Sequence, residues 1–242
     1  MRTIRGILAF LAIWWIARVA GADGLLYQLP KDGTWATYDA VVKTRIDGRD
    51  MNIGQKWRIA SVGNMSEGGE PCRWIEFKKD TKIESEFFPH TDHETWTLLF
   101  PVKYLAKGES PMEHFLRGWH QVDKYAPEKI TKPIEGRSAL LRLILSGPAK
   151  DTRKLEPMEV TSKLGKLSCE GVQGTVEVIL KTGIKSKNTF TNRLHPRSPF
   201  GVVAGHWALD RSGEEANSPP ATLDITLADF GDNASSQIPN EK

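Results

Sequence analysis

Apolar residues recur at every second position in several separate stretches of this chain, and this period of two constrains the fold most. Successive side chains of a strand point to opposite faces of a sheet, so such a stretch predicts a strand with one buried face. In 34–46 the apolar residues of one parity are Ala36, Tyr38, Ala40, Val42 and Ile46. The same pattern occurs in 51–62, 174–180, 201–209 and 223–227, and shorter or less regular strands are predicted at 72–79, 83–88, 93–100 and 187–194. About nine strands predict a mainly β (α+β) fold built on a large curved antiparallel sheet or half-barrel.

The segments between these strands contain one turn signal and two helix signals. Asp47-Gly48 lies between the first two alternating runs, as the turn of a hairpin would. The stretch 110–119 begins Ser-Pro-Met-Glu, the residue types of a helix-capping box. The stretch 137–147 is apolar on most of a helical circumference, although it also fits a strand. We therefore expect two or so short helices that cover the sheet.

The first 22 residues have the pattern of a secretory signal peptide. Arg2 and Arg5 form a basic start, an apolar run follows from Gly6 to Ala17, and Ala20-Gly21-Ala22 offers small residues for cleavage. An uncleaved membrane anchor is the alternative, but the apolar run is shorter than the about 20 residues that span hydrocarbon. The pattern predicts export to a periplasmic or extracellular space, with membrane contact only through the signal peptide.

The remaining chain fits a single β-rich domain over 23–232 and a polar C-terminal tail over 233–242. The whole chain has 33 basic and 30 acidic residues, and 1–22 contains three of the arginines and no acid. The mature chain is therefore formally neutral. A protein without a basic field attracts phosphate backbones poorly, so no nucleic-acid partner is expected.

Cys72 and Cys169 are the two cysteines, and two interpretations of them stay open. An exported chain can keep a disulfide, whereas two separately buried thiols would explain the same residues. Pairing requires Cα atoms within about 7 Å, which the sequence does not show. The absence of a CxxC pair argues against a structural zinc site.

The stretch 90–94, His-Thr-Asp-His-Glu, is the densest set of ligating side chains. On a strand, His90, Asp92 and Glu94 face one way and His93 the other, so at most three ligands would converge. A solvated strand end is the favoured explanation of these residues, so we predict no metal and no other cofactor. The chain also lacks GxSxG, GxGxxG, P-loop and HExxH motifs, so no catalytic residue is assigned.

Six tryptophans remain after cleavage, and large aromatic side chains can fill a core or line a ligand cavity. Trp57 and Trp207 lie on the apolar parity of regular strands, as does Val203, so we expect them on the concave face. If 137–147 covers that face, Leu140 and Ile144 complete the candidate lining. Core filling is the simpler role for most of these residues.

The strand that contains Trp207 is entered through a tight corner, Arg-Ser-Pro-Phe-Gly-Val-Val, at 197–203. A signal peptide, a long antiparallel meander, a helical insertion and a late strand entered through this corner resemble the periplasmic lipoprotein-carrier superfamily and its secreted relatives. The resemblance implies a curved half-barrel covered by helices, with an apolar cavity that takes lipid or acyl chains.

These observations favour an exported, non-catalytic protein that binds or carries a hydrophobic, lipid-like or acyl-like ligand beneath a curved sheet. The first alternative is a secreted hydrolase or metal-dependent enzyme that uses the region of His90, Asp92 and Glu94. The second is a structural protein that interacts with other envelope proteins and has a filled core.

Overall fold

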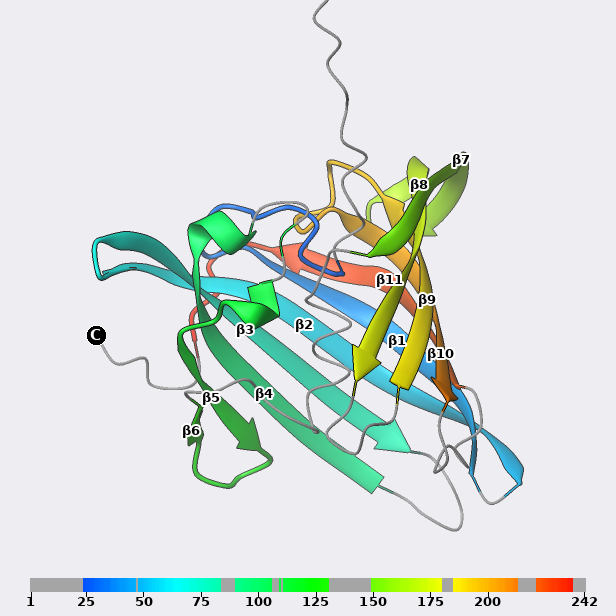
Figure 1. Ribbon diagram of the computed structural model, residues 1–242, viewed down its shortest axis with the longest axis horizontal. Coiled ribbons are helices and arrows are strands. Elements are labelled where there is room, and N and C mark those ends of the chain that lie inside the picture. Colours follow the sequence, from blue (N-terminus) through cyan, green and yellow to red (C-terminus); the bar gives the residue numbers. More distant parts are fainter. Residues whose placement is uncertain are drawn as a thin grey trace, which may run out of the picture.

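The computed structural model describes residues 24–46, 48–83, 90–105, 109, 111–130, 149–179, 185–212 and 221–236. These residues form one antiparallel sheet of eleven strands (Figure 1). The strands are β1 (Trp35–Ile46), β2 (Arg49–Glu67), β3 (Glu70–Ile83), β4 (His90–Pro101), β5 (Arg117–Val122), β6 (Glu128–Ile130), β7 (Lys150–Ser162), β8 (Gly165–Ile179), β9 (Lys185–Leu194), β10 (Val202–Ser212) and β11 (Ala221–Gly231). Two 3-10 helices, η1 (Val102–Leu105) and η2 (Pro111–Glu113), are the only helices within these ranges. The predicted mainly β class with a large antiparallel sheet is confirmed.

The order of strands across the sheet is β6-β5-β4-β3-β2-β1-β11-β10-β9-β8-β7. The first and last strands of the chain are therefore neighbours in the middle of the sheet, and β6 and β7 form its edges. The predicted hairpin at Asp47-Gly48 is present, because Ile46 is paired with Arg49.

The sheet is strongly curved, so that its two halves share one apolar cluster on the inner face (Figure 1). Register shifts occur in β1 between Thr37 and Tyr38, in β2–β3 between Ser61 and Asn64, and in β10 between Val202 and Ala204. Such irregularities add local twist and bend the strands that carry them. The main cluster contains Trp57 from one half of the sheet and Phe190 from the other.

One end of the inner face is covered by segments outside the strands. Leu25 and Leu26 precede β1, Leu105 belongs to η1 and Met112 to η2, and all four are buried in the main cluster. We call these four residues the end cap. It lies at the end of the sheet where β4 finishes and β1 starts, since η1 follows Pro101 directly, and the Ser61 backbone accepts a hydrogen bond from Gly33 N and donates one to Thr34 O.

The corner before β10 is anchored to the N-terminal segment. Gly201 has φ +88, a conformation that favours glycine, and a Cβ there would stand 2.8 Å from Tyr27 Cδ1. Ser198 Oγ donates a hydrogen bond of 2.6 Å to Val202 O, and Gln28 Nε2 donates one of 2.6 Å to Ser198 O. The corner is thus a buried structural junction, with Phe200 fully inaccessible to solvent.

Two expectations are corrected by the structure, and two others lie wholly or mostly outside the described residues. The described residues contain eleven strands instead of about nine. The helix expected over 110–119 is wrong, because only 111–113 is helical and β5 begins at Arg117. Gly118 lies against β4 so closely that a Cβ would stand 2.5 Å from Thr97 O, so strand pairing overrides the capping-box pattern. The predicted helix 137–147 and most of the predicted strand 83–88 lie outside the described residues.

The C-terminal segment that follows β11 packs on the outer face of the sheet. Ala234 N donates a hydrogen bond of 2.7 Å to Gly33 O, and Ser236 Oγ donates one of 3.0 Å to the buried Glu76. Residues 233–236, which the sequence places in a polar tail, therefore contact the domain.

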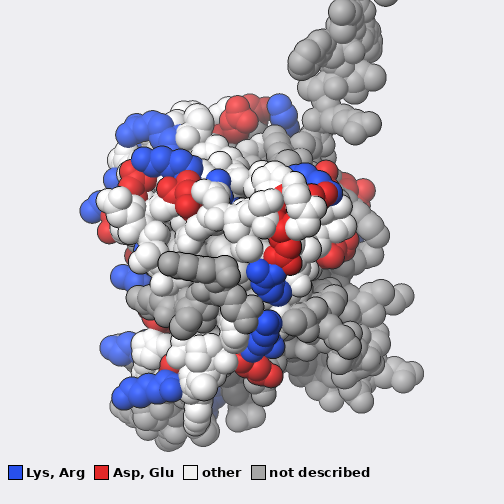
Figure 2. All heavy atoms as spheres, turned by 90° about the vertical axis from the view of Figure 1, so that its left-hand side faces the viewer, with Lys and Arg blue, Asp and Glu red and all other residues white. Residues whose placement is uncertain are grey.

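On the side of the molecule displayed in Figure 2, basic and acidic side chains are interspersed rather than gathered into a patch of one sign. This distribution agrees with the formal neutrality of residues 23–242. Within the described ranges, no helix is long and apolar enough to cross a membrane.

Candidate functional site

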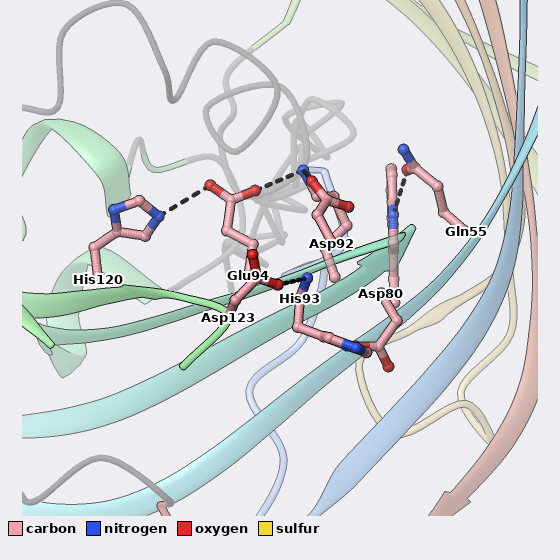
Figure 3. A network of polar contacts seen from close by, with 9 residues as sticks. Gln55, Asp80, Asp92, His93, Glu94, His120 and Asp123 are labelled. Atoms are coloured by element: carbon pink, nitrogen blue, oxygen red, sulfur yellow. Dashed lines mark hydrogen bonds and ion pairs between the residues drawn. The ribbon is translucent and has the colours of Figure 1, made fainter. Parts of the chain in front are cut away.

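Polar side chains interrupt the apolar inner face on strands β2 to β5. In one row across the sheet, Tyr38, Trp57, Lys79 and Glu94 are successive register partners. The next row, toward the end opposite the end cap, continues from Ala40 through three polar residues, Gln55, Thr81 and Asp92. We call Gln55, Lys79, Thr81, Asp92, Glu94 and His120 the polar floor. Figure 3 labels four of them, Gln55, Asp92, Glu94 and His120.

Glu94 is the centre of an ion-pair network in the polar floor. Lys79 Nζ lies 2.6 Å from Glu94 Oε2, and His120 Nε2 lies 3.0 Å from Glu94 Oε1 (Figure 3). The three side chains are between 8% and 17% exposed. His120 is also stacked on Trp96, with ring centroids 3.6 Å apart, so both the position and the orientation of its ring are held.

The ionisation of Glu94 follows from these contacts. Burial disfavours the charged carboxylate, but the hydrogen bonds from His120 and Lys79 and the charge of Lys79 outweigh it and lower the pKa of Glu94 to about 2. Because an ionised carboxylate only accepts hydrogen bonds, Nε2 of His120 carries the proton in this contact. The charges of Lys79 and Glu94 therefore offset each other.

Asp92 and Thr81 form the part of the polar floor whose hydrogen-bonding capacity is not used. They are direct register partners, yet Asp92 Oδ1 and Thr81 Oγ1 are both buried with no hydrogen-bond partner among the described residues. Asp92 Oδ2 lies 3.9 Å from Lys79 Nζ, beyond hydrogen-bonding distance. A carboxylate oxygen and a hydroxyl side by side can accept hydrogen bonds from a donor group.

Another buried polar side chain lies on the inner face of the opposite half of the sheet. Asn192 in β9 is fully buried, and within the described ranges neither its Oδ1 nor its Nδ2 has a hydrogen-bond partner. A Cβ on Gly205, its register partner in β10, would stand 2.8 Å from Asn192 Oδ1 and 2.4 Å from the Trp207 ring. Asn192 and Trp207 therefore project from the same side of these two strands.

The structure separates the residues that the sequence proposed as ligand contacts. Trp57 and Trp207 are buried in the main cluster on the inner face, and Trp57 Nε1 donates a hydrogen bond of 2.8 Å to Gln55 Oε1. Val203 does not share their face; it belongs to a separate cluster with Cys169. The register shift between Val202 and Ala204 inserts one residue, so alternation counted back from Trp207 assigns Val203 to the wrong side. Leu140 and Ile144 lie outside the described residues.

The candidate metal ligands are brought into the polar floor only in part. Asp92 and Glu94 share the inner face as the strand pattern predicts, whereas His93 contacts Asp80, with Nδ1 2.7 Å from Oδ1. The side chain of His90 lies outside the described part of the structure. Within that part, no three His, Cys, Asp or Glu side chains are placed to hold a metal ion. Glu94 is instead bound by a lysine and a histidine.

Cys72 and Cys169 are free buried thiols in the structure. Cys72 packs with Trp74, and Cys169 packs with Val203 in a different cluster. The structure therefore corresponds to the interpretation of two separate thiols and not to the disulfide. Burial raises the pKa of both thiols, which keeps them in the unreactive protonated form.

Lys79 and His120 were not singled out from the sequence, although both contact Glu94. They belong to neighbouring strands, and alternation within one strand does not give the register between strands. The position of Lys79 on the inner face could have been predicted, because it has the same parity as the apolar residues Ile75 and Phe77. For His120 the incorrect helix over 110–119 hid its strand position.

No protein-family model matches this chain, and no curated protein matches it. Three solved structures are similar to it. A candidate exported protein of Bacteroides fragilis with a YmcC-like fold is 9% identical, covers 85% of this chain and 99% of its own, and has a TM-score of 0.34. A candidate lipoprotein of Parabacteroides distasonis is 10% identical, covers 86% of this chain and 100% of its own, and has a TM-score of 0.35.

The third structure is a DUF1329 family protein of Desulfovibrio piger, 10% identical, covering 86% of this chain and 88% of its own, with a TM-score of 0.23. All three TM-scores are low, so the function proposed below rests on residues of this chain.

Proposed function

We propose that this protein is an exported, non-catalytic binding protein or carrier for a hydrophobic molecule with an acyl-like body, held against the inner face of the sheet. Export rests on Arg2, Arg5, the apolar run and the small residues before Asp23. The resemblance to the lipoprotein-carrier superfamily favours the same class of ligand.

The observation that carries the proposal is the combination, on one inner face, of large apolar side chains with buried polar atoms that have no partner in the described part of the chain. Trp57, Trp96 and Trp207 supply apolar surface, and Thr81 and Asn192 supply the unpartnered polar atoms. A core that is only structural satisfies its buried polar groups, whereas ligand sites combine apolar walls with a few convergent polar groups. The end cap fills one end of this face, so the ligand is placed toward the other.

The test uses a pair of substitutions at adjacent residues of β1. Val42 packs against the main cluster, whereas Val41 is exposed on the other face. Val42→Trp should occupy space on the inner face and weaken binding of a dodecyl probe by about tenfold, equivalent to ~1.4 kcal/mol. Val41→Trp should leave binding unchanged. Binding is measured by native mass spectrometry and by tryptophan fluorescence titration.

Failure of every single-chain dodecyl probe to bind the folded protein would contradict the proposal, as would equal effects of the two substitutions. Protein purified from its native compartment should also carry a hydrophobic molecule that native mass spectrometry detects. Protein that is bare in every preparation would favour the structural alternative.

A further inference from the structure

The polar floor has a charge balance that selects the head group of a ligand. The charges of Lys79 and Glu94 offset each other, and the ring of His120 contacts Glu94 and stacks on Trp96. Asp92 remains as a carboxylate whose Oδ1 has no hydrogen-bond partner. Beside it stands Thr81, which is 6% exposed and has no partner for its hydroxyl.

We infer that the polar floor recognises the head group of an amphipathic ligand through Asp92 and Thr81, and that this head group is a hydrogen-bond donor, a hydroxyl or a protonated amine, rather than a carboxylate or a phosphate. This inference rests on the proposed function, because it names the ligand class of the same inner face.

Lys79 does not make the site attractive to an anion, although it is the nearest cation. Its ammonium group lies 2.6 Å from Glu94 and 3.9 Å from Asp92, so two carboxylates surround it. An anionic head group beside Thr81 would face Asp92 as a like charge, and like-charge contacts away from bulk water are unfavourable. A donor head group instead gives Asp92 Oδ1 the hydrogen bond that it lacks.

The rows of the sheet also place the apolar body of such a ligand. The row of Gln55, Thr81 and Asp92 lies farther from the end cap than the row of Trp57, Lys79 and Glu94. Val42 and Ile53 form the next inner-face pair beyond Gln55, and Phe190, Asn192 and Trp207 face inward from the other half of the sheet. A chain attached to the head group can therefore follow apolar side chains on either side of the polar row.

The experiment compares three probes that share a dodecyl chain and differ only in the head group. Dodecanol is titrated below its solubility limit, and dodecylammonium and dodecanoate below their critical micelle concentrations. Tryptophan fluorescence and native mass spectrometry are the readouts. Dodecanol and dodecylammonium should bind at least about fivefold more tightly than dodecanoate. Comparison of the first two probes distinguishes a hydroxyl ligand from an amine ligand.

Asp92→Asn tests the assignment, with Asp80→Asn as its matched control. Asp80 is adjacent to Thr81 in β3, contacts His93 and is about half exposed, so its substitution removes the same charge away from the polar floor. Asp92→Asn should weaken the binding of dodecylammonium by about tenfold and change that of dodecanol by less than about threefold. Only the amine loses an ion pair, whereas the amide oxygen of Asn can still accept a hydrogen bond from the hydroxyl. Asp80→Asn should change neither.

If dodecanoate binds as tightly as dodecanol and dodecylammonium or more tightly, the inference of a donor head group is wrong, while the proposed function still holds. If Asp92→Asn and Asp80→Asn change the affinity for dodecylammonium equally, Asp92 does not have the proposed role. If no dodecyl probe binds the folded protein, the proposed function itself fails and the inference falls with it.

Discussion

Gly201 shows how one backbone position ties two distant parts of the chain together. Its φ of +88 disfavours any residue with a Cβ, and Tyr27 occupies the place where that Cβ would stand. The Tyr27 side chain belongs to the N-terminal segment, which also binds the corner through Gln28. The corner and this segment therefore form one unit.

We expect Gly201→Ala to lower the free energy of unfolding by about 3 kcal/mol, from backbone strain and from overlap with Tyr27. Gly48→Ala is the control, because Gly48 has φ +76 but nothing within 4 Å of its Cβ position. It should cost about 1 kcal/mol, the backbone term alone. Urea denaturation of both variants measures the difference, and equal losses would show that the contact with Tyr27 is unimportant.

Glu94 should make the fold sensitive to acid. Its pKa is lowered to about 2 in the folded chain, so its ionised form stabilises the fold above the unfolded-state pKa of about 4.3, and this contribution is lost as pH falls toward 2. The loss between these values should be about 2–3 kcal/mol. Urea midpoints measured across this range should fall less steeply for Glu94→Gln than for the wild type.

Glu159→Gln is the control for this pH series, because Glu159 pairs with Lys166 at the exposed surface. It should keep the pH dependence of the wild type. If the urea midpoint of Glu94→Gln falls with pH as steeply as that of the wild type, other carboxyl groups cause the acid sensitivity.

At the level of elements, alternation predicts the strands that have one apolar face and misses those that do not. β1, β2 and β11 were recognised because most of their inward residues are apolar. β7 was missed because it is an edge strand with mostly exposed side chains, a proline at 157 and two register shifts. Exposure removes the contrast between two faces, and an inserted residue changes the parity.

The candidate site was predictable in the same measure. The shared face of Asp92 and Glu94 follows from the spacing of two within one strand. Their contact with Lys79 and His120 depends on the register between strands, which is set by hairpin lengths and bulges rather than by any single segment. The unpartnered state of Thr81 depends on the surroundings of its side chain, which no periodicity encodes.

The two cysteines lie on strands far apart in the sheet order, β3 and β8. We expect the folded protein to contain two free thiols. A thiol-reactive reagent should detect them only after denaturation, because both side chains are buried. The melting temperature of the protein should not change when a reductant is added. A fall in melting temperature under reduction would instead indicate a disulfide.

At the level of the whole molecule, the end cap makes the N-terminal segment part of the core. A chain that begins at Asp23 keeps Leu25 and Leu26, whereas one that begins at Pro30 loses both, together with Gln28. Each leucine is almost completely buried, so the shorter chain should lose about 4 kcal/mol of unfolding free energy. Thermal denaturation of the two chains measures this, and equal melting temperatures would show that the cap is dispensable.

The pairing of β1 with β11 makes the sheet divisible. On one side of this seam lie six described strands, β1 to β6, and on the other lie five, β7 to β11; each set is a meander of sequential neighbours. The hydrogen bond from Tyr38 OH to Val202 O crosses from one set to the other. A chain divided between β6 and β7 would therefore yield two fragments, each with one newly unpaired strand at the seam. Their reassociation would rebuild the inner face, as in a split reporter whose halves regain function only together.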